Sequence, residues 1–248
     1  MFEFFKKDNG EKKILFGRSH DYMDYPVSAL SEIPRWYKDT PRFTEGDSPR
    51  IRSKVTSGTN LGVKYCIPFL DTLSIGYMAL LWQDLQVQRN PDGYPEFSWA
   101  LDPQVIDGRN PVGFEELPIP AGHDEKQYIW QQPFSVKLPK GYSALYTHPL
   151  NRFDLPFTTL SGVHDSDTIL APGNFPFYIR EDFEGIIPRG TPIFQIIPFK
   201  RESWVGEGSP ELASEAEIRS QKTASMLTGF YKKLLWTRKS FRMKRENE

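Results

Sequence analysis

Two acidic residues in one short turn are the clearest candidates for chemistry in this chain. Asp165 and Asp167 lie in the turn Gly162–Asp167, which reads GVHDSD. A carboxylate held next to a water molecule can act as a general base, so both residues are candidate catalytic groups. Aspartates at this spacing are also typical of turns that they stabilise through hydrogen bonds to the backbone. We favour the turn-stabilising interpretation and keep catalysis as the alternative.

A second set of polar residues could bind a ligand. Its members are three residues of one short turn and a glutamine in a later apolar run: His148, Asn151, Arg152 and Gln195. A guanidinium fork can bind a carboxylate or phosphate group through two parallel hydrogen bonds. The sequence therefore predicts a candidate binding site made of these four residues, in which the guanidinium of Arg152 would bind an anionic group.

Histidines near the acidic turn raise the question of a metal site. Two imidazoles and one carboxylate, such as His148, His164 and Asp165, can form the facial site of an iron or zinc enzyme, and His123 is a further candidate. The sequence has no diagnostic spacing such as His-Glu-x-x-His. We expect no metal and no cofactor. A metal-dependent enzyme of the double-stranded β-helix type is the third interpretation.

The composition excludes several classes of protein. With 31 basic and 32 acidic residues, the chain has no overall charge that would attract nucleic acid or an acidic membrane. One cysteine, Cys66, permits no intramolecular disulfide and favours an intracellular location. Its apolar surroundings predict a buried thiol rather than a nucleophile. No window approaches the roughly 18 apolar residues of a membrane span.

The elements that would position these residues are mostly short strands. Apolar runs closed by glycine or proline turns predict strands near 63–73, 76–88, 96–99, 128–130 and 134–136. The sequence Asn90–Gly93 (NPDG) predicts the turn of a hairpin. Nine prolines from Pro133 to Pro198 exclude a long helix there. The predicted fold class is therefore mainly β.

Three segments are expected along the chain: an irregular segment over 1–60, a β-domain over 61–208 and a basic amphipathic helix over 209–248. A short helix or docking segment is expected at Ser31–Lys38. Ser209 can cap the C-terminal helix, which is expected to run from Glu211 to Met243 with an apolar stripe between Ile218 and Trp236. The cations beyond this stripe form either a solvated helix end or a surface for an acidic protein or nucleic acid.

The stretch 138–199 resembles the trimeric dUTPase and dCTP deaminase superfamily. In that superfamily a Gly-Val-Ile-Asp-x-Asp-Tyr turn precedes a Gly-Asp-x-Ile-Ala-Gln-Leu strand, and Gly162–Asp167 and Gly190–Ile196 are similar to these two motifs. Pro139–Tyr142 looks like the turn before the strand that leads to the active site. The resemblance implies a β-clip fold, an antiparallel β-barrel or sandwich, and a homotrimer. It also implies that Asp165 would contact the sugar and the attacking water.

Three departures weaken the enzymatic implication. The Pro-Arg-Ser-Gly phosphate-binding turn is replaced by His148–Arg152, and the base-stacking tyrosine is replaced by Thr168. The glycine-rich C-terminal arm has only a faint counterpart at Gly206–Ser209. Because triphosphate binding needs convergent N–H donors and an arginine fork, these losses argue against dUTP hydrolysis. Magnesium would be needed only if the hydrolase interpretation held.

The span Ile33–Trp204 also resembles a family of tailed-phage proteins that has no known activity. The residues that carry this resemblance are Ile33-Pro34-x-Trp36-Tyr37-Lys38, Lys64-x-Cys66-x-Pro68-Phe69-x-Asp71, Gly141-Tyr142-Ser143, Asn174-Phe175-Pro176-Phe177 and Pro198-Phe199-Lys200-Arg201-Glu202-x-Trp204. It implies a viral protein of the host cytoplasm or the virion.

Together these patterns predict a phage-encoded, homo-oligomeric β-protein with a C-terminal helix that acts as a binding or structural component. A divergent nucleotide hydrolase or deaminase that uses Asp165 is the second interpretation.

Overall fold

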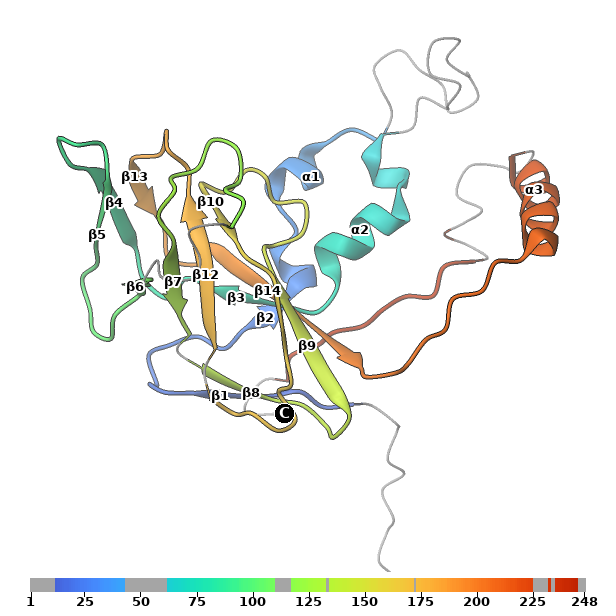
Figure 1. Cartoon of the computed structure of the whole chain (residues 1–248), viewed down its shortest axis with the longest axis horizontal. Helices are drawn as coiled ribbons and strands as arrows, with labels where there is room; N and C mark the ends of the chain where they lie inside the picture. Colours follow the sequence, from blue (N-terminus) through green and yellow to red (C-terminus); the bar gives the residue numbers. More distant parts are fainter. Residues whose placement is uncertain are drawn as a thin grey trace, which may run out of the picture. The chain divides into compact units, whose positions relative to one another are not determined.

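The chain folds mainly into antiparallel β-sheets (Figure 1). The computed structural model describes residues 12–42, 62–109, 117–132, 134–171, 173–224, 232 and 235–244. The described residues fall into two compact units. Those within Met1–Val27 and Gly76–Arg201 form the first, called here the β-unit, and those within Ser28–Ile75 and Glu202–Glu248 form the second, called the helical unit. The mainly β prediction is confirmed.

The strands form four sheets in which every described pairing is antiparallel. The five-stranded sheet has the order β11 (Gly162–His164), β9 (Tyr142–Thr147), β14 (Pro192–Lys200), β3 (Tyr77–Leu80) and β2 (Val27–Ser28). The four-stranded sheet has the order β10 (Phe157–Thr159), β12 (Asn174–Ile179), β7 (Tyr128–Gln131) and β6 (Ile106–Gly108). The smaller sheets are β13 (Gly185–Ile187), β4 (Leu85–Arg89) and β5 (Pro95–Ser98), and the pair β1 (Leu15–Arg18) and β8 (Phe134–Lys137).

Alternating burial explains why these segments are strands. In β4, Leu85 and Val87 are buried while Gln86 and Gln88 are more exposed, and β7 and β8 show the same period of two. Successive side chains of a strand point to opposite faces, so this pattern gives one apolar face to the core. In β14, by contrast, Pro192 to Ile196 are all buried. That strand therefore lies inside the unit, with both faces covered.

Aromatic rings fill the core around the four-stranded sheet. Trp130 stacks on Phe177 with ring centroids 3.8 Å apart, and the edge of Phe157 meets Trp130 at 5.0 Å. The indole N–H of Trp130 donates to the hydroxyl of Thr159 at 3.1 Å, and that hydroxyl donates to the carbonyl of Ile193 at 2.7 Å. The buried hydroxyl of Thr159 thus accepts the indole N–H of Trp130, the largest core side chain, and links β10 to β14.

The predicted turns and hairpins are present. Gly93 has a φ of 86° in the Asn90–Gly93 turn, and the Asn90 side chain accepts hydrogen bonds from the backbone N–H groups of Asp92 and Tyr94. Strand β5 then returns along β4 as expected. Within the described parts of 138–199 there is no helix, which confirms the prediction from the prolines.

Strand β1 lies in a region that was predicted to be irregular. It pairs with β8 over Leu15–Arg18, and Phe16 packs edge-on against Tyr77 and Phe134. Strand β6 was also not predicted, because its short sequence lies in a stretch rich in proline, glycine and charge. In both cases pairing with a long-range partner overrides a weak local pattern.

The helical unit corrects the strand predicted near 63–73. This stretch forms the 3-10 turn η2 (Val63–Tyr65) and the helix α2 (Ile67–Ser74), while η1 (Ala29–Glu32) and α1 (Arg35–Asp39) cover the expected helix at 31–38. Pro68 sits in the first turn of α2, where its missing N–H is harmless. Cys66 is the N-cap of α2 and is exposed, so the prediction of a buried thiol is wrong.

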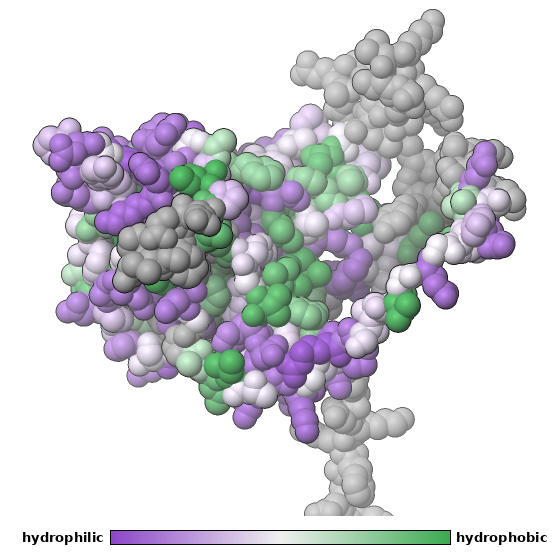
Figure 2. All heavy atoms as spheres, in the orientation of Figure 1, coloured by the Kyte–Doolittle hydropathy of each residue, from purple (hydrophilic) through white to green (hydrophobic). Residues whose placement is uncertain are grey.

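The C-terminal helix α3 spans Pro210–Ala224, with the Ser209 hydroxyl accepting from the N–H of Leu212 as a cap. Its residues up to Glu217 are exposed, and hydrophilic and hydrophobic side chains are mixed along this part of the chain in Figure 2. The predicted continuation to Met243 is wrong for residues 236–244, which are not helical. Most of the predicted apolar stripe falls outside the residues whose side chains are described; Leu235 is exposed and Trp236 is half-buried.

One cation of the tail, Lys239, is exposed but forms an ion pair within the helical unit. Its ammonium contacts the carboxylate of Asp71 on α2 at 2.5 Å, and the indole N–H of Trp236 donates to the same carboxylate at 3.0 Å. The hydroxyl of Ser28 also donates to the carbonyl of Phe241. Asp71 thus anchors the tail within the helical unit.

The hydroxyl of Thr159 gives a direct test of the core. Thr159→Val keeps the shape of the side chain but leaves the Trp130 N–H and the Ile193 carbonyl without their partner. We expect a loss of about 1–3 kcal/mol in the free energy of unfolding, measured by urea denaturation. Thr159→Ser retains the hydroxyl and should lose less. Equal losses in the two variants would show that the hydrogen bonds are unimportant.

Candidate functional site

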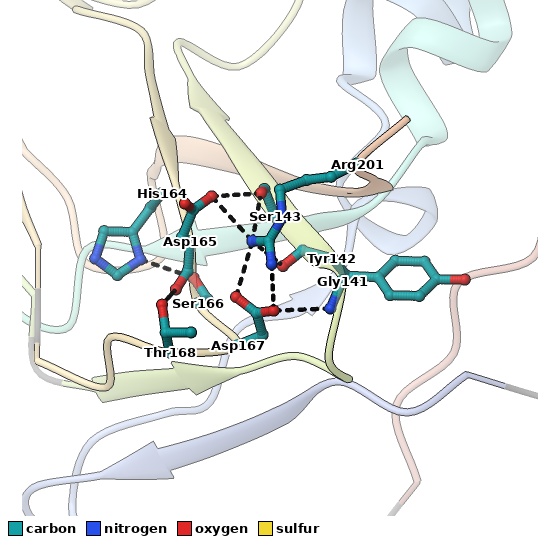
Figure 3. Close-up of polar contacts among 9 residues, drawn as sticks. All are labelled: Gly141, Tyr142, Ser143, His164, Asp165, Ser166, Asp167, Thr168 and Arg201. Carbon is teal, nitrogen blue, oxygen red and sulfur yellow. Dashed lines mark hydrogen bonds and ion pairs between the residues drawn. The ribbon is translucent and has the colours of Figure 1, made fainter. Parts of the chain in front are cut away.

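Arg201 joins the two candidate catalytic aspartates (Figure 3). Its Nη1 donates to Asp167 Oδ1 at 2.8 Å while its Nη2 donates to the other oxygen of that carboxylate, and Nη1 lies 3.1 Å from Asp165 Oδ1. The Asp167 side chain is only 2% exposed, whereas that of Asp165 is 52% exposed. Arg201 therefore binds both oxygens of the covered Asp167 carboxylate but only one oxygen of the more exposed Asp165 carboxylate.

Backbone and hydroxyl donors complete the cluster. Asp167 accepts the N–H of Gly141 at 2.8 Å, and Asp165 accepts the hydroxyl of Ser143 at 2.6 Å. Gly141 has a φ of 85°, a conformation in which glycine avoids the steric cost that other residues meet. The turn before β9, the turn after β11 and the end of β14 are thereby tied together.

Sheet register explains why these residues meet. Strand β9 pairs with β14 so that Ser143 faces Phe199 and Tyr142 faces Lys200, and with β11 so that Ala144 faces His164. Asp165 and Arg201 each follow directly after these positions at the same end of the sheet. Three separate sequence patterns, 139–143, 162–167 and 198–201, thus converge on one ion-pair cluster.

The cluster lowers the pKa values of both aspartates. The hydrogen bonds from Arg201, followed by that from the Gly141 N–H, lower the pKa of Asp167 to about 2. The Ser143 hydroxyl and then Arg201 hold the pKa of Asp165 below its ordinary value. Efficient general bases have pKa values near the working pH. Both groups are ionised and weakly basic at neutral pH, which suits a structural clamp better than proton abstraction.

The candidate ligand-binding residues lie elsewhere, around the loop His148–Pro156. The side chain of Gln195 is fully buried and accepts the N–H of Leu150 at 3.0 Å. Asn151 takes a φ of 60°, which asparagine tolerates better than most residues. The guanidinium of Arg152 pairs with Asp154, through Nε at 2.9 Å and Nη2 at 2.9 Å. These residues fix the loop. The guanidinium of Arg152, which was predicted to bind a ligand, binds the carboxylate of Asp154.

His148 is held in one neutral tautomer. The N–H of Thr159 donates to His148 Nδ1 at 3.3 Å, so the proton lies on Nε2, which donates to the carbonyl of Arg152 at 3.0 Å. Burial lowers the pKa of His148, and the hydrogen bond to the Arg152 carbonyl opposes this only in part. The histidine is therefore a neutral loop anchor at physiological pH.

The two predicted sets of residues do not converge. Gln195 faces Thr147 on β9, whereas Asp165 bonds to Ser143 on the same strand. Four residues of a strand span roughly 13 Å, so the acidic cluster and the Gln195 side chain lie at different ends of β9. Asp165, Arg152 and Gln195 therefore belong to two separate structures.

The histidines do not assemble with a carboxylate either. His164 Nδ1 is 2.8 Å from the hydroxyl of Ser166, and His123 Nε2 is 3.0 Å from that of Thr158. Across the described residues, no three histidine, cysteine, aspartate or glutamate side chains are grouped so that they could hold a metal ion. The described helices also include none that is long and apolar enough to cross a membrane.

A pocket of about 330 Å³ lies beside the His148–Pro156 loop. Its walls combine apolar and polar side chains with a glycine turn: Ala121, Gly122, His123, His148, Phe153, Leu155, Phe157, Thr158, Arg180, Glu181 and Asp182. Arg89 fixes two chain segments, 121–124 and 180–182, that contribute lining residues to this pocket. Its guanidinium binds the carboxylate of Asp124 at 2.8 Å and the carbonyl of Arg180 at 2.7 Å, and both members of the Arg89–Asp124 pair are largely buried.

The sequence did not indicate which residues would form hydrogen bonds and ion pairs with the candidate site residues. Arg201 and Gly141 stood in quoted sequence patterns, but nothing local indicated that they would meet Asp167. Phe153 and Arg180 carried no motif. An arginine at the end of a strand could have been paired with the acidic turn only if the order of strands β11-β9-β14 had been known.

No protein-family model matches the sequence, and no curated protein is significantly similar to it. Among solved structures, the chain is similar to a mutant dUTPase from phage phi11 of S. aureus. The two share 10% sequence identity with a TM-score of 0.31, over 68% of this chain and 94% of the other.

The lowered pKa of Asp167 predicts how stability depends on pH. Because its pKa is about 2 in the folded protein and 3.8 ordinarily, ionised Asp167 stabilises the fold above pH 3.8, and this contribution is lost as the pH falls towards 2. Asp167→Asn should therefore lower the melting temperature at pH 7, with the difference from wild type shrinking below pH 4.

Asp182→Asn is the matched control for this measurement. Asp182 also pairs with an arginine, Arg180, but its side chain is 62% exposed. An exposed pair contributes little, so a smaller effect on melting is expected. A difference between Asp167→Asn and wild type that stays constant from pH 7 to pH 2 would contradict the ionic role of Asp167.

Proposed function

We propose that this chain is a phage-encoded binding or structural protein with a dUTPase-like β-fold and no dUTPase catalysis. The observation that carries the proposal is the engagement of both candidate catalytic carboxylates by Arg201. Their low pKa values and the pairing of Arg152 with Asp154 support it, because neither a general base near neutrality nor an available anion-binding fork results. The viral origin, in the host cytoplasm or the virion, rests on the sequence resemblance to tailed-phage proteins.

A divergent nucleotide hydrolase or deaminase is the second candidate. It is favoured by the half-exposed side chain of Asp165, which could still meet a water molecule. Magnesium would then accompany the substrate. The histidines His148 and His164 give no comparable support to the metal-dependent alternative, because each is bonded within its own loop or turn.

We also propose that the protein is a homo-oligomer, as the trimers of the resembling superfamily suggest. Large apolar side chains are exposed on and just after the edge strand β11: Val163, Ile169 and Leu170 are 64%, 50% and 49% exposed. Edge strands with apolar side chains are sites where another chain can pair. A second contact, with an acidic protein or nucleic acid, would rest on the exposed cations Arg238, Arg242 and Lys244.

The proposal predicts no turnover of dUTP or dCTP. Purified protein with magnesium should release no pyrophosphate from dUTP and no ammonia from dCTP, measured by coupled assays at neutral pH. Asp165→Asn should be indistinguishable from wild type in both assays. Robust turnover that disappears in Asp165→Asn would refute the proposal and establish the hydrolase or deaminase.

The proposed oligomer predicts sensitivity at β11. Val163→Lys places a charge on the exposed apolar edge and should lower the mass measured by light scattering, because a buried charge at an interface is costly. Ile186→Lys is the control: Ile186 is 56% exposed on the edge strand β13. An unchanged mass in Val163→Lys, or a monomeric wild type, would exclude this edge as the interface.

A further inference from the structure

Phe153 is an exposed aromatic residue on a loop that hydrogen bonds fix in position. Its side chain is 84% exposed, yet the loop that carries it is bonded on both sides. Before it, Leu150 donates to the buried Gln195, and the carbonyl of Arg152 accepts from His148. After it, Asp154 binds the guanidinium of Arg152. Buried polar groups thus position a loop whose exposed apolar side chain contributes little to the core.

Phe153 is one of the residues that line the 330 Å³ pocket. Leu155 and Phe157, which are 7% and 1% exposed, supply an apolar wall of this pocket beside its polar groups. Ligand sites in proteins start at roughly this volume and combine apolar walls with a few polar groups.

The polar groups of the pocket define which ligand fits. Both nitrogens of His148 and both of His123 already bond within the protein, to Thr159 and Arg152 and to Ala121 and Thr158. Arg180 binds Asp182 through Nε and Nη2. The exposed carboxylates of Glu181 and Asp182 border the pocket and can accept hydrogen bonds.

We propose that the pocket beside Phe153 binds a single planar aromatic ring that carries an N–H donor at its edge. The ring would pack against Phe153 and the apolar wall, and its N–H would point to the carboxylates at the rim. Offset or edge-to-face packing of aromatic rings favours such a complex beyond the area that it buries. The fixed loop reduces the entropy lost on binding. This inference adds a ligand class to the binding role proposed above and rests on it.

Indole is the probe, and saturation-transfer NMR with a full titration measures its affinity for the whole chain. Phe153→Ser should weaken indole binding about tenfold, whereas Phe153→Tyr should retain it. Tyr94→Ser is the control, since Tyr94 is 57% exposed on the turn between β4 and β5, outside the pocket. Benzofuran, which has an ether oxygen in place of the N–H, should bind more weakly than indole to wild type.

Two results would overturn the proposal: no saturation transfer from the wild-type protein to indole, or equal affinity of wild type and Phe153→Ser. Melting temperatures of the variants establish that each is folded. A blocked Gly-Trp-Gly peptide identifies the source of the ring. Tighter binding than indole would support a tryptophan of a partner protein, and equal binding a free heterocycle. Failure of indole to bind leaves the absence of dUTP turnover intact, so the two proposals fail separately.

Discussion

The clamp between Arg201 and Asp167 is the constraint on which the rest of the β-unit depends. It joins the end of β14 to the turns that flank β9 and β11, so three neighbouring strands of the five-stranded sheet are tied together at one end. A covered carboxylate that keeps its charge needs this arrangement, because an unpaired ion in such a place would be strongly destabilising. The same clamp explains why the acidic turn, which has the composition of an active site, has the electrostatics of a structural element.

The two ends of β9 belong to different local structures. One end of the strand carries the charged clamp, and the other end leads into a loop fixed by Gln195 and His148. The candidate catalytic residues and the candidate binding residues therefore belong to two separate local structures. Beside these two structures, an aromatic side chain is exposed at Phe153 and an aliphatic one at Val163.

Local patterns predicted much of the fold and little of the site. The NPDG turn, the strands near 128–130 and 134–136, and the absence of a long helix among the prolines between 133 and 198 each depend on a few neighbouring residues, and each prediction is confirmed in the described residues. The strand predicted at 63–73 failed because its apolar residues suit a short helix equally well, and Pro68 fits a first helical turn. Asp165 and Asp167 were found from their types, but their partner Arg201 depends on strand order, which a local pattern does not contain.

The charge states of Asp165 and Asp167 show whether Arg201 holds the acidic turn as an ion-pair clamp. Carbon-detected NMR of the side-chain carboxyl groups, recorded from pH 1.5 to pH 7 on the folded protein, gives the pKa of each aspartate. The account predicts a pKa of about 2 for Asp167 and a pKa below the ordinary value of 3.8 for Asp165. A pKa for Asp165 raised towards neutrality would contradict it, because such a carboxylate would be poised for proton transfer rather than held by Arg201.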